Sequence, residues 1–274
     1  MKTLIIGASG QLGLELSSLF PEAVKTYSSF EIPGGVKLDV TDFPRLEDLI
    51  LKVRPDAVIN ASAFTDVDGC EKDRQKAIKV NAEAVKHIVR ASRVVEAYVV
   101  HVSTDYVFDG ERGLYSELDL PHPINYYGLS KLLGEAYALS YDDSLVVRTS
   151  GVFRHKGFPT FVYKTLKSGN VVNAYKGYYS PISARLLAEA IKELVDMRKT
   201  GLIHVAGERI SRYDLAMKVA ELFNLPKLVK EVDNVKGWIA KRPFDSSLDV
   251  TKARKLLSTE FYSLEENLKY MVVS

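Results

Sequence analysis

Residues 3–13 read TLIIGASGQLG, and they set the architecture expected for the whole chain. The apolar, β-branched run Thr3–Ile6 is typical of a buried strand, and glycines follow it at once. Glycines let a backbone turn sharply and approach a pyrophosphate, while the start of the next helix supplies N–H groups and positive dipole. Because the loop directly follows an apolar strand, it favours dinucleotide binding over a plain structural turn. The residues expected at this site are Gly7, Ser9, Gly10, Gln11, Leu12 and Gly13.

Strand and helix patterns go on alternating through the first half of the chain. Further strands are expected at Ala23–Tyr27, Val36–Leu38, Ala57–Asn60, Ala97–Val102 and Leu145–Arg148. Helices are expected at Leu12–Leu19, Phe43–Lys52, Asp73–Val94 and Tyr126–Leu139. Compact β-branched runs of this kind are buried on both faces of a parallel sheet. The alternation predicts right-handed βαβ units and an α/β fold class, a doubly wound parallel-sheet Rossmann fold.

The pattern changes after residue 150, where aromatic residues crowd Phe153–Tyr179 between glycine and proline breakers. Regular elements then return, and they are expected at helix Ala184–Arg198, strand Leu202–Ala206 and helix Arg212–Leu222. We interpret residues 1–150 as a dinucleotide-binding Rossmann domain. Residues 151–274 are interpreted as mainly a smaller C-terminal substrate-binding lobe, interleaved with the Rossmann domain.

Composition limits the classes of partner and compartment. The chain of 274 residues carries a formal net charge of +2, too small to predict nucleic acid or an anionic membrane as a partner. No apolar run approaches the roughly 20 residues that span a bilayer, and Met1–Thr3 leads into the first strand without a signal peptide. Cys70 is the only cysteine, and no Cys/His cluster has metal-ligand spacing. We therefore expect a cytoplasmic protein without a metal site.

Two strand ends are candidates for the adenosine half of a dinucleotide. Asp39 and Val40 follow a short strand, where the carboxylate could accept the adenine amino group; Thr41 and Asp42 suit the N-cap of the next helix better. Small residues end the next strand, as a surface under a cofactor needs: Asn60, Ala61, Ser62 and Ala63.

The end of the second strand bears on the choice between NADP and NAD. An acidic residue there would bind the ribose 2′-hydroxyl and select NAD, but no carboxylate occurs before Glu31. Ser28 and Ser29 could instead donate to a 2′-phosphate, although the usual arginine is absent. NADP(H) is favoured, and NAD(H) stays open.

Tyr127 and Lys131 form a Tyr-x-x-x-Lys pair on an expected helix, where the i, i+4 spacing puts both side chains on one face. A cation at that distance is expected to stabilise phenolate and lower the tyrosine pKa towards neutrality. Tyr163 and Lys167 have the same spacing, so spacing alone does not choose between the pairs. Tyr163 is interpreted as packing within the smaller lobe.

Context favours the first pair. Thr104 ends a strand at the carboxyl edge of the expected sheet, where parallel sheets bind ligands, and its hydroxyl could polarise a substrate carbonyl. We therefore predict Thr104, Tyr127 and Lys131 as catalytic residues. His101 and His204 lie in apolar strands and are expected to be hydrogen-bonded core residues. Cys70 has no paired histidine to activate it.

Taken together, these residues resemble the extended short-chain dehydrogenases/reductases, and within them the dTDP-4-dehydrorhamnose reductase family. The resemblance runs along most of the chain, and Ser103–Phe108 is its most specific segment. The other matching segments are Gly7–Gly13, Pro55–Ala61, Ala63–Asp68, Val80-Asn81, Tyr127–Lys131, Gly134-Glu135, Arg148–Ser150, Ser180-Pro181, Arg242-Pro243 and Ser247–Asp249.

The resemblance implies NAD(P)H-dependent reduction of the 4-keto group of a nucleotide-linked 6-deoxysugar, as in dTDP-rhamnose biosynthesis. Tyr127 would protonate the sugar oxygen, Thr104 would polarise the carbonyl, and Lys131 would tune Tyr127 and bind the nicotinamide ribose. Family positions place Ser150 near the nicotinamide, and the substrate beside Thr65, Thr104, Tyr106, Gly151 and Arg242. A homodimer stays open; no ligand residues for a metal-linked dimer can be matched.

The chain also departs from the family. A tryptophan usually follows the Arg-Thr-Ser segment, where it can stack on the sugar, but here Gly151 follows. An Asp-Gln pair expected near Tyr178 is also missing. Two alternatives stay open: another sugar-nucleotide ketoreductase or epimerase, and a non-catalytic, NADP-binding regulatory subunit of the methionine adenosyltransferase type.

Overall fold

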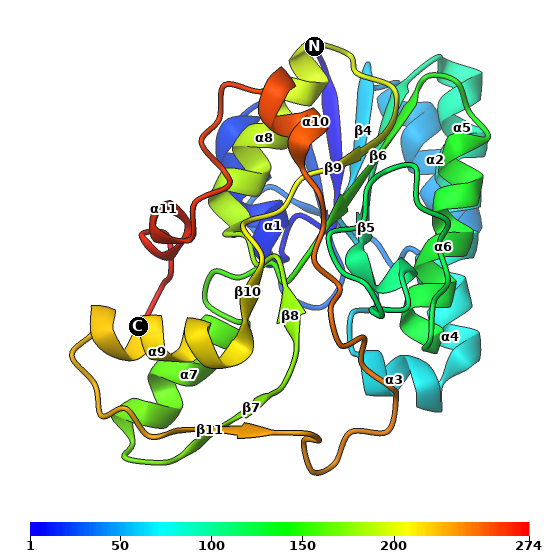
Figure 1. Cartoon of the computed structure of the whole chain (residues 1–274). Helices are drawn as coiled ribbons and strands as arrows, with labels where there is room; N and C mark the ends of the chain where they lie inside the picture. The colour runs from blue at the N-terminus through cyan, green and yellow to red at the C-terminus, as the bar shows by residue number, and fades with distance from the viewer. Residues whose placement is uncertain (274) are drawn as a thin grey trace.

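A seven-stranded parallel sheet forms the centre of the computed structural model, which describes residues 1–273 (Figure 1). The strand order is β3-β2-β1-β4-β5-β6-β9. The strands are β1 (Thr3–Ile6), β2 (Val24–Tyr27), β3 (Val36–Lys37), β4 (Ala57–Asn60), β5 (Tyr98–Thr104), β6 (Ser144–Thr149) and β9 (Gly201–His204). The order reverses between β1 and β4, so the ligand crevice of such a sheet lies at the carboxyl ends of these strands.

Helices cover both faces of the sheet, which confirms the predicted doubly wound α/β fold. The covering helices are α1 (Gln11–Leu19) and α8 (Ala184–Asp196) on one face, and α2 (Phe43–Val53), α5 (Ala84–Val95) and α6 (Tyr126–Leu139) on the other. Alternate residues of one strand serve the two faces: Ile5 packs in the core that contains Ile191, whereas Leu4 packs with Leu46 and Ile88. Burial on both faces explains why the strands are continuous apolar runs.

The helix expected at Asp73–Val94 is interrupted, and this part of the prediction was wrong. The chain forms α4 (Arg74–Ile78), a π-helical turn at Lys79–Glu83 and then α5, with α3 (Val67–Lys72) just before them. Asn81 in the π turn accepts from the Phe64 backbone N–H (2.8 Å) and donates to the Ser130 hydroxyl (3.0 Å). The residue added by the π turn lets Asn81 join the end of β4 to α6, a gain that helical periodicity does not reveal.

A smaller lobe lies beyond the carboxyl edge of the sheet (Figure 1). Its elements are α7 (Phe158–Lys167), β7 (Val172–Tyr175), β8 (Tyr178–Tyr179), β10 (Ile210–Ser211), α9 (Arg212–Leu222), β11 (Val229–Val232) and α11 (Leu264–Leu268). They share a core of their own that includes Val162, Leu215 and Leu268. Between these elements the chain returns to the large sheet as α8 and β9, and α10 (Thr251–Leu256) contacts β9. A domain division at residue 150 stays a prediction.

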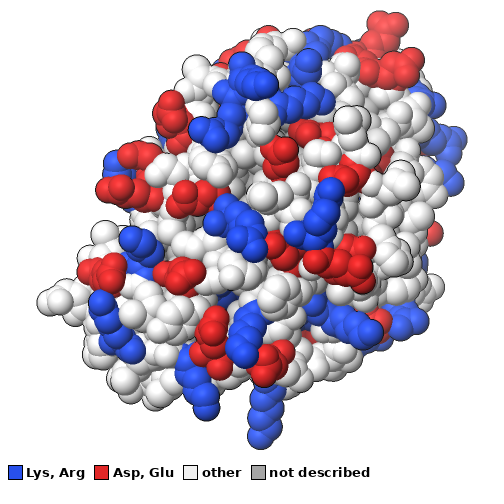
Figure 2. All heavy atoms as spheres, in the orientation of Figure 1, with Lys and Arg blue, Asp and Glu red and all other residues white. Residues whose placement is uncertain are grey.

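Charged side chains of both signs are interspersed over the face of the molecule drawn in Figure 2. Within residues 1–273, no helix combines the length and apolar character needed to cross a membrane. In the same residues, His, Cys, Asp and Glu side chains form no group of three or more that could hold a metal ion.

A buried ion pair joins α6 to the sheet. Arg148 on β6 donates to both carboxylate oxygens of Glu135 on α6, at 2.9 and 2.7 Å, and both side chains are almost fully buried. Ser103 on β5 donates to the same carboxylate, and His204 on β9 lies 3.4 Å from the guanidinium. Neighbouring strands and α6 are therefore held in register by one charge cluster.

We expect Arg148→Met to lower the free energy of unfolding by about 3–5 kcal/mol, because Glu135 would be left as an unpaired buried charge. Denaturant unfolding measures the loss. The exposed pair of Lys52 and Asp48 gives the control: Lys52→Met should cost less than about 1 kcal/mol. Adding Glu135→Leu to Arg148→Met should recover most of the loss. An Arg148→Met variant as stable as the Lys52→Met control would contradict the expectation.

Candidate active site

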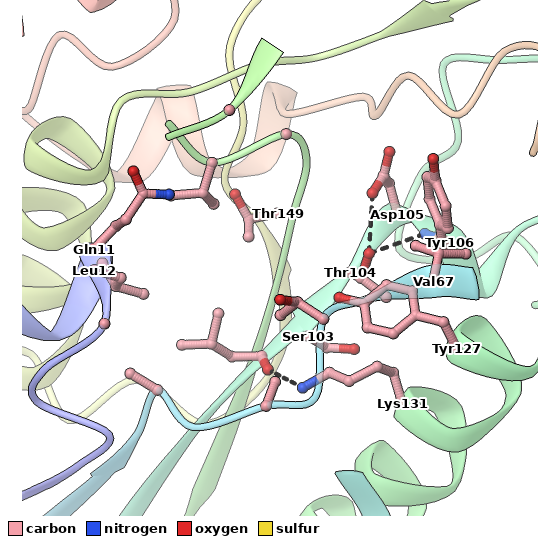
Figure 3. A pocket seen from close by; sticks show the side chains of 18 of the residues that line it. Gln11, Leu12, Val67, Ser103, Thr104, Asp105, Tyr106, Tyr127, Lys131 and Thr149 are labelled. Atoms are coloured by element: carbon pink, nitrogen blue, oxygen red, sulfur yellow. Dashed lines mark hydrogen bonds between the residues drawn. The ribbon is translucent and has the colours of Figure 1, made fainter. Parts of the chain in front are cut away.

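One cleft of about 560 Å³ is lined both by residues at the carboxyl ends of the sheet strands and by residues of the smaller lobe. Many of the predicted site residues line it: Gly10, Gln11, Leu12, Ala61, Ser62, Ala63, Thr65, Thr104, Tyr106, Tyr127, Lys131 and Gly151. Residues from the phosphate loop, from the ends of β4 and β5 and from α6 thus meet around one space (Figure 3).

The other predicted residues are not part of the cleft lining, namely Gly7, Ser9, Gly13, Ser28, Asp39, Val40, Asn60, Ser150 and Arg242. Two of them shape the phosphate loop. Gly7 has φ +82, a conformation that favours glycine, and a Cβ on Gly13 would lie 2.2 Å from the Gly7 carbonyl oxygen. Gly10 is the N-cap of α1 and offers no side chain to the first N–H groups of that helix. Those groups are left for an anion in the cleft.

Asn60 and Asp39 each stabilise a turn by hydrogen bonds to the residue two positions later. The Asn60 side-chain oxygen accepts from the backbone N–H and the hydroxyl of Ser62, at 3.2 and 2.7 Å. Asp39 accepts from the backbone N–H and hydroxyl of Thr41, and these hydrogen bonds lower the pKa of its carboxyl. Asp42 is the N-cap of α2, as predicted. A contact of Asp39 with adenine stays a prediction.

The structure brings the three predicted catalytic side chains together (Figure 3). Tyr127 and Lys131 lie in the first turns of α6, and Thr104 ends β5. Gly128 permits the approach, because a Cβ there would lie 2.0 Å from the carbonyl oxygen of Tyr106. The helix therefore packs directly on the turn that follows Thr104, a contact that the Tyr-x-x-x-Lys spacing alone does not specify.

Burial determines the ionisation of this group. Desolvation raises the pKa of the Tyr127 phenol above its usual range, and a hydrogen bond with Thr104 opposes the rise. Desolvation also lowers the pKa of Lys131 to about 8, while Glu135 opposes that shift. The Lys131 ammonium donates to the Val102 carbonyl oxygen at 2.7 Å. The expectation that Lys131 would lower the pKa of Tyr127 was therefore wrong for this structure, in which burial dominates.

Asp105 is a cleft residue that the sequence argument missed. Its buried carboxylate accepts hydrogen bonds from the hydroxyls of Thr104 (3.0 Å), Ser150 (2.8 Å) and Ser246, and burial raises its pKa. Ser150 is thus turned towards Asp105, and its own oxygen accepts from the Ser180 backbone N–H. The sequence signal that could have identified Asp105 was its position as an acidic residue directly after a buried strand.

The remaining lining residues were not predicted as site residues from the sequence. They are Val67, Val102, Ser103, Asp105, Thr149, Val152, Lys156, Gly157, Phe158, Tyr179 and Arg212. Most belong to strand ends, to the loop between β6 and α7, or to the smaller lobe. Only tertiary packing brings these segments to the cleft.

Tyr179 fills the space beside Gly151. Gly151 has φ +50, and a Cβ on it would lie 2.5 Å from the ring of Tyr179, which is 5% exposed. The aromatic side chain expected after Arg-Thr-Ser is thus replaced by one from β8. The missing tryptophan does not leave this wall of the cleft without an aromatic ring.

Arg242 lies outside the main cleft. Its guanidinium donates to both carboxylate oxygens of Asp68, at 3.0 and 2.9 Å, and lies over the Trp238 ring. Arg242 and Trp238 line a neighbouring pocket of about 300 Å³. A substrate contact for Arg242 stays a prediction.

The residues for which no catalytic role was predicted lie in environments that fit structural roles. His101 and His204 are buried and lie within hydrogen-bond distance of Asn60 and of the Tyr115 carbonyl, as expected. Burial raises the pKa of the Cys70 thiol to about 12, which disfavours the reactive thiolate. Tyr163 packs edge-on against Phe223 in the lobe.

The family model described as "RmlD substrate binding domain" matches residues 1–274. A curated relative, the dTDP-4-dehydrorhamnose reductase of Aggregatibacter actinomycetemcomitans, is 31% identical over 98% of this chain and 97% of its own length.

Two solved structures are also similar. A hypothetical dTDP-4-dehydrorhamnose reductase from Sulfolobus tokodaii is 68% identical, with a TM-score of 0.97 and full coverage of both chains. The dTDP-4-dehydrorhamnose reductase of Bacillus anthracis, solved in complex with NADP, is 29% identical, with a TM-score of 0.89 over 98% of this chain and 97% of that chain. This chain therefore belongs to the RmlD family, the family of the dTDP-4-dehydrorhamnose reductases.

Proposed function

We propose that this protein is an NAD(P)-dependent oxidoreductase that reduces the 4-keto group of dTDP-4-keto-6-deoxy-L-mannose and forms dTDP-L-rhamnose. The observation that carries the proposal is the meeting of Thr104, Tyr127 and Lys131 with an uncapped phosphate loop around one cleft. Membership of the RmlD family supports the same substrate class.

The residues present fit a dinucleotide. Gly7 and Gly13 let the backbone of the phosphate loop come close to α1, and the uncapped N–H groups after Gly10 suit a pyrophosphate. Small residues from Ala61 to Ala63 form the floor of the cleft beyond β4. When bound, the reduced nicotinamide supplies the hydride for the sugar carbon.

Tyr127 is the proton donor in the proposed reaction. Because burial raises its pKa, the phenol keeps its proton at neutral pH and can deliver it to the sugar oxygen as that oxygen gains negative charge. The Thr104 hydroxyl lies beside the phenol, and it polarises the same carbonyl by turning its one proton from Asp105 to the substrate oxygen. Lys131, which donates to the Val102 carbonyl oxygen, would hold the nicotinamide ribose when the cofactor is bound and would return a proton to Tyr127.

Lys156 supports a preference for NADP. Its backbone N–H donates to the Gln11 side chain at 2.8 Å, and its ammonium lies 5.9 Å from the centre of the Phe30 ring, two residues after Ser28. A cation from the loop between β6 and α7 therefore lies near the segment that follows β2, the part of the fold where an NADP 2′-phosphate is recognised. It stands in for the arginine missing from the second-strand end.

The cellular setting is part of the proposal. We expect the enzyme in the cytoplasm, where the free, buried Cys70 is compatible with a reducing environment, and we leave a homodimer open. A 4-epimerase would retain its cofactor without net turnover, so stoichiometric NAD(P)H consumption distinguishes a reductase from that alternative.

Tyr127→Phe should reduce kcat by about 10²- to 10⁴-fold, because the proton donor is lost, while NADPH affinity stays unchanged. NADPH oxidation with dTDP-4-keto-6-deoxy-L-mannose measures the effect. Tyr163→Phe is the matched control, since Tyr163 has the same spacing to a lysine but lies outside the cleft. Turnover of Tyr127→Phe at the wild-type rate, or no turnover of any keto sugar by the wild type, would refute the proposed reaction.

Lys156→Ala should weaken NADPH binding by about tenfold and NADH binding by less than twofold, because a charge-assisted contact to the 2′-phosphate is lost. Fluorescence titration with each cofactor gives both affinities. Lys167→Ala, which removes a lysine from α7 outside the cleft, should change neither. Equal losses for the two cofactors would place Lys156 at the shared pyrophosphate and remove the argument for NADP preference.

A further inference from the structure

The charged side chains lining the cleft are unequally distributed in sign. Lys131, Lys156 and Arg212 are cations, and Asp105 is the one carboxylate among the described lining residues. Three hydroxyls already donate to Asp105, so it is occupied within the protein. A cleft with this excess of positive charge is suited to anionic ligands.

The Arg212 guanidinium has a nitrogen without a hydrogen-bond partner among the described residues. Its Nη1 atom is buried and makes no hydrogen bond to any of residues 1–273. A buried, unpaired guanidinium N–H is costly, and such a group in a binding site is commonly satisfied by ligand. Arg209, three residues earlier, offers a contrast, because it donates to Asp245 at 2.8 Å.

The Tyr179 phenol is a second polar group without a partner among the described residues, and its ring lies next to Arg212. Its side chain is 5% exposed, and the phenol oxygen has no hydrogen-bond partner within the described chain. The Arg212 guanidinium lies 4.4 Å from the centre of the Tyr179 ring. The antiparallel pairing of Tyr179 with Ile210 brings β8 beside the start of α9 and so fixes this stacking.

Arg212 and Tyr179 lie at the end of the cleft that is proposed to hold the substrate. Burial raises the pKa of Tyr106, and the Arg212 charge is close enough to oppose that rise. Asp105 shows the same opposition from Arg212. Lys156, by contrast, contacts the phosphate loop through Gln11. Arg212 and Lys156 therefore lie at different ends of the cleft.

We propose that Arg212, with the Tyr179 phenol, binds the diphosphate group of the nucleotide-sugar substrate. The inference rests on the proposed function, which supplies a substrate with that group. Guanidinium and phenol donors match phosphate oxygens. Asp105, the carboxylate nearest to this point among the described lining residues, already accepts from three hydroxyls, so a diphosphate supplies the partner that the Arg212 guanidinium lacks. Tyr179 additionally presents its ring beside Gly151, where the sugar would pack.

Calorimetric titration with dTDP, at saturating NADPH, tests the assignment without any turnover. Arg212→Gln should weaken dTDP binding by about 10- to 100-fold, the usual effect of losing a hydrogen-bonded charge. Arg212→Lys should lose less because it keeps the charge, and Tyr179→Phe should lose about threefold to tenfold. Arg209→Gln, an identical change at a neighbouring arginine already paired with Asp245, should stay within twofold.

Two further measurements localise the contact. Thymidine, which lacks phosphate, should bind Arg212→Gln and wild type equally well, and NADPH affinity should be unchanged, which also reports an intact fold. Wild-type dTDP affinity in Arg212→Gln would overturn the inference and leave the proposed reaction standing. A loss seen with dTDP-L-rhamnose but not with dTDP would overturn it as well, since the arginine would then contact the sugar. If wild type bound no nucleoside diphosphate, both this inference and the proposed substrate would fail.

Discussion

The buried pair of Arg148 and Glu135 is the interaction on which the catalytic side of the cleft depends. Two charges taken out of water are tolerated only when each is fully paired. The hydrogen bonds between Arg148 and Glu135 therefore fix the position of α6 relative to β6. Ser103 adds β5 to the same cluster. Thr104 follows Ser103, and Lys131 lies one turn before Glu135. The buried cluster of Arg148, Glu135 and Ser103 thus positions Thr104 and Lys131.

Burial also sets the chemistry above that cluster. The same desolvation keeps the phenol of Tyr127 protonated and brings the pKa of Lys131 down to about 8. A neutral proton donor beside a lysine that titrates near neutrality is a suitable arrangement for protonating a sugar oxygen and recovering the proton afterwards. The arrangement follows from the low polarity of the site more than from attraction between the two side chains.

The smaller lobe contributes Tyr179 and Arg212 to the lining of the cleft, and we propose that these residues recognise the substrate. A glycine stands where an aromatic residue is usual in the family, yet Tyr179 from β8 occupies that wall of the cleft. Arg212 follows on the adjacent strand-helix junction and lies over the same ring. If the proposed roles hold, the catalytic residues lie on the sheet and α6 while Tyr179 and Arg212 lie in the smaller lobe, so we expect substrate recognition to change more readily than the hydride chemistry.

The sequence by itself determined the sheet, the phosphate loop and the three positions proposed as catalytic, because these depend on local patterns: buried β-branched runs, glycine spacing, a hydroxyl at a strand end and an i, i+4 pair on a helix. Helical periodicity missed the π turn at Lys79–Glu83, since one added residue hardly alters an apolar pattern. The tertiary structure alone decided the ionisation of Tyr127, the occupation of Asp105 by hydroxyls, the pairing of Arg242 with Asp68, and the meeting of Tyr179 with Arg212. Each of these depends on burial and on contacts between segments far apart in the chain, which no local pattern encodes.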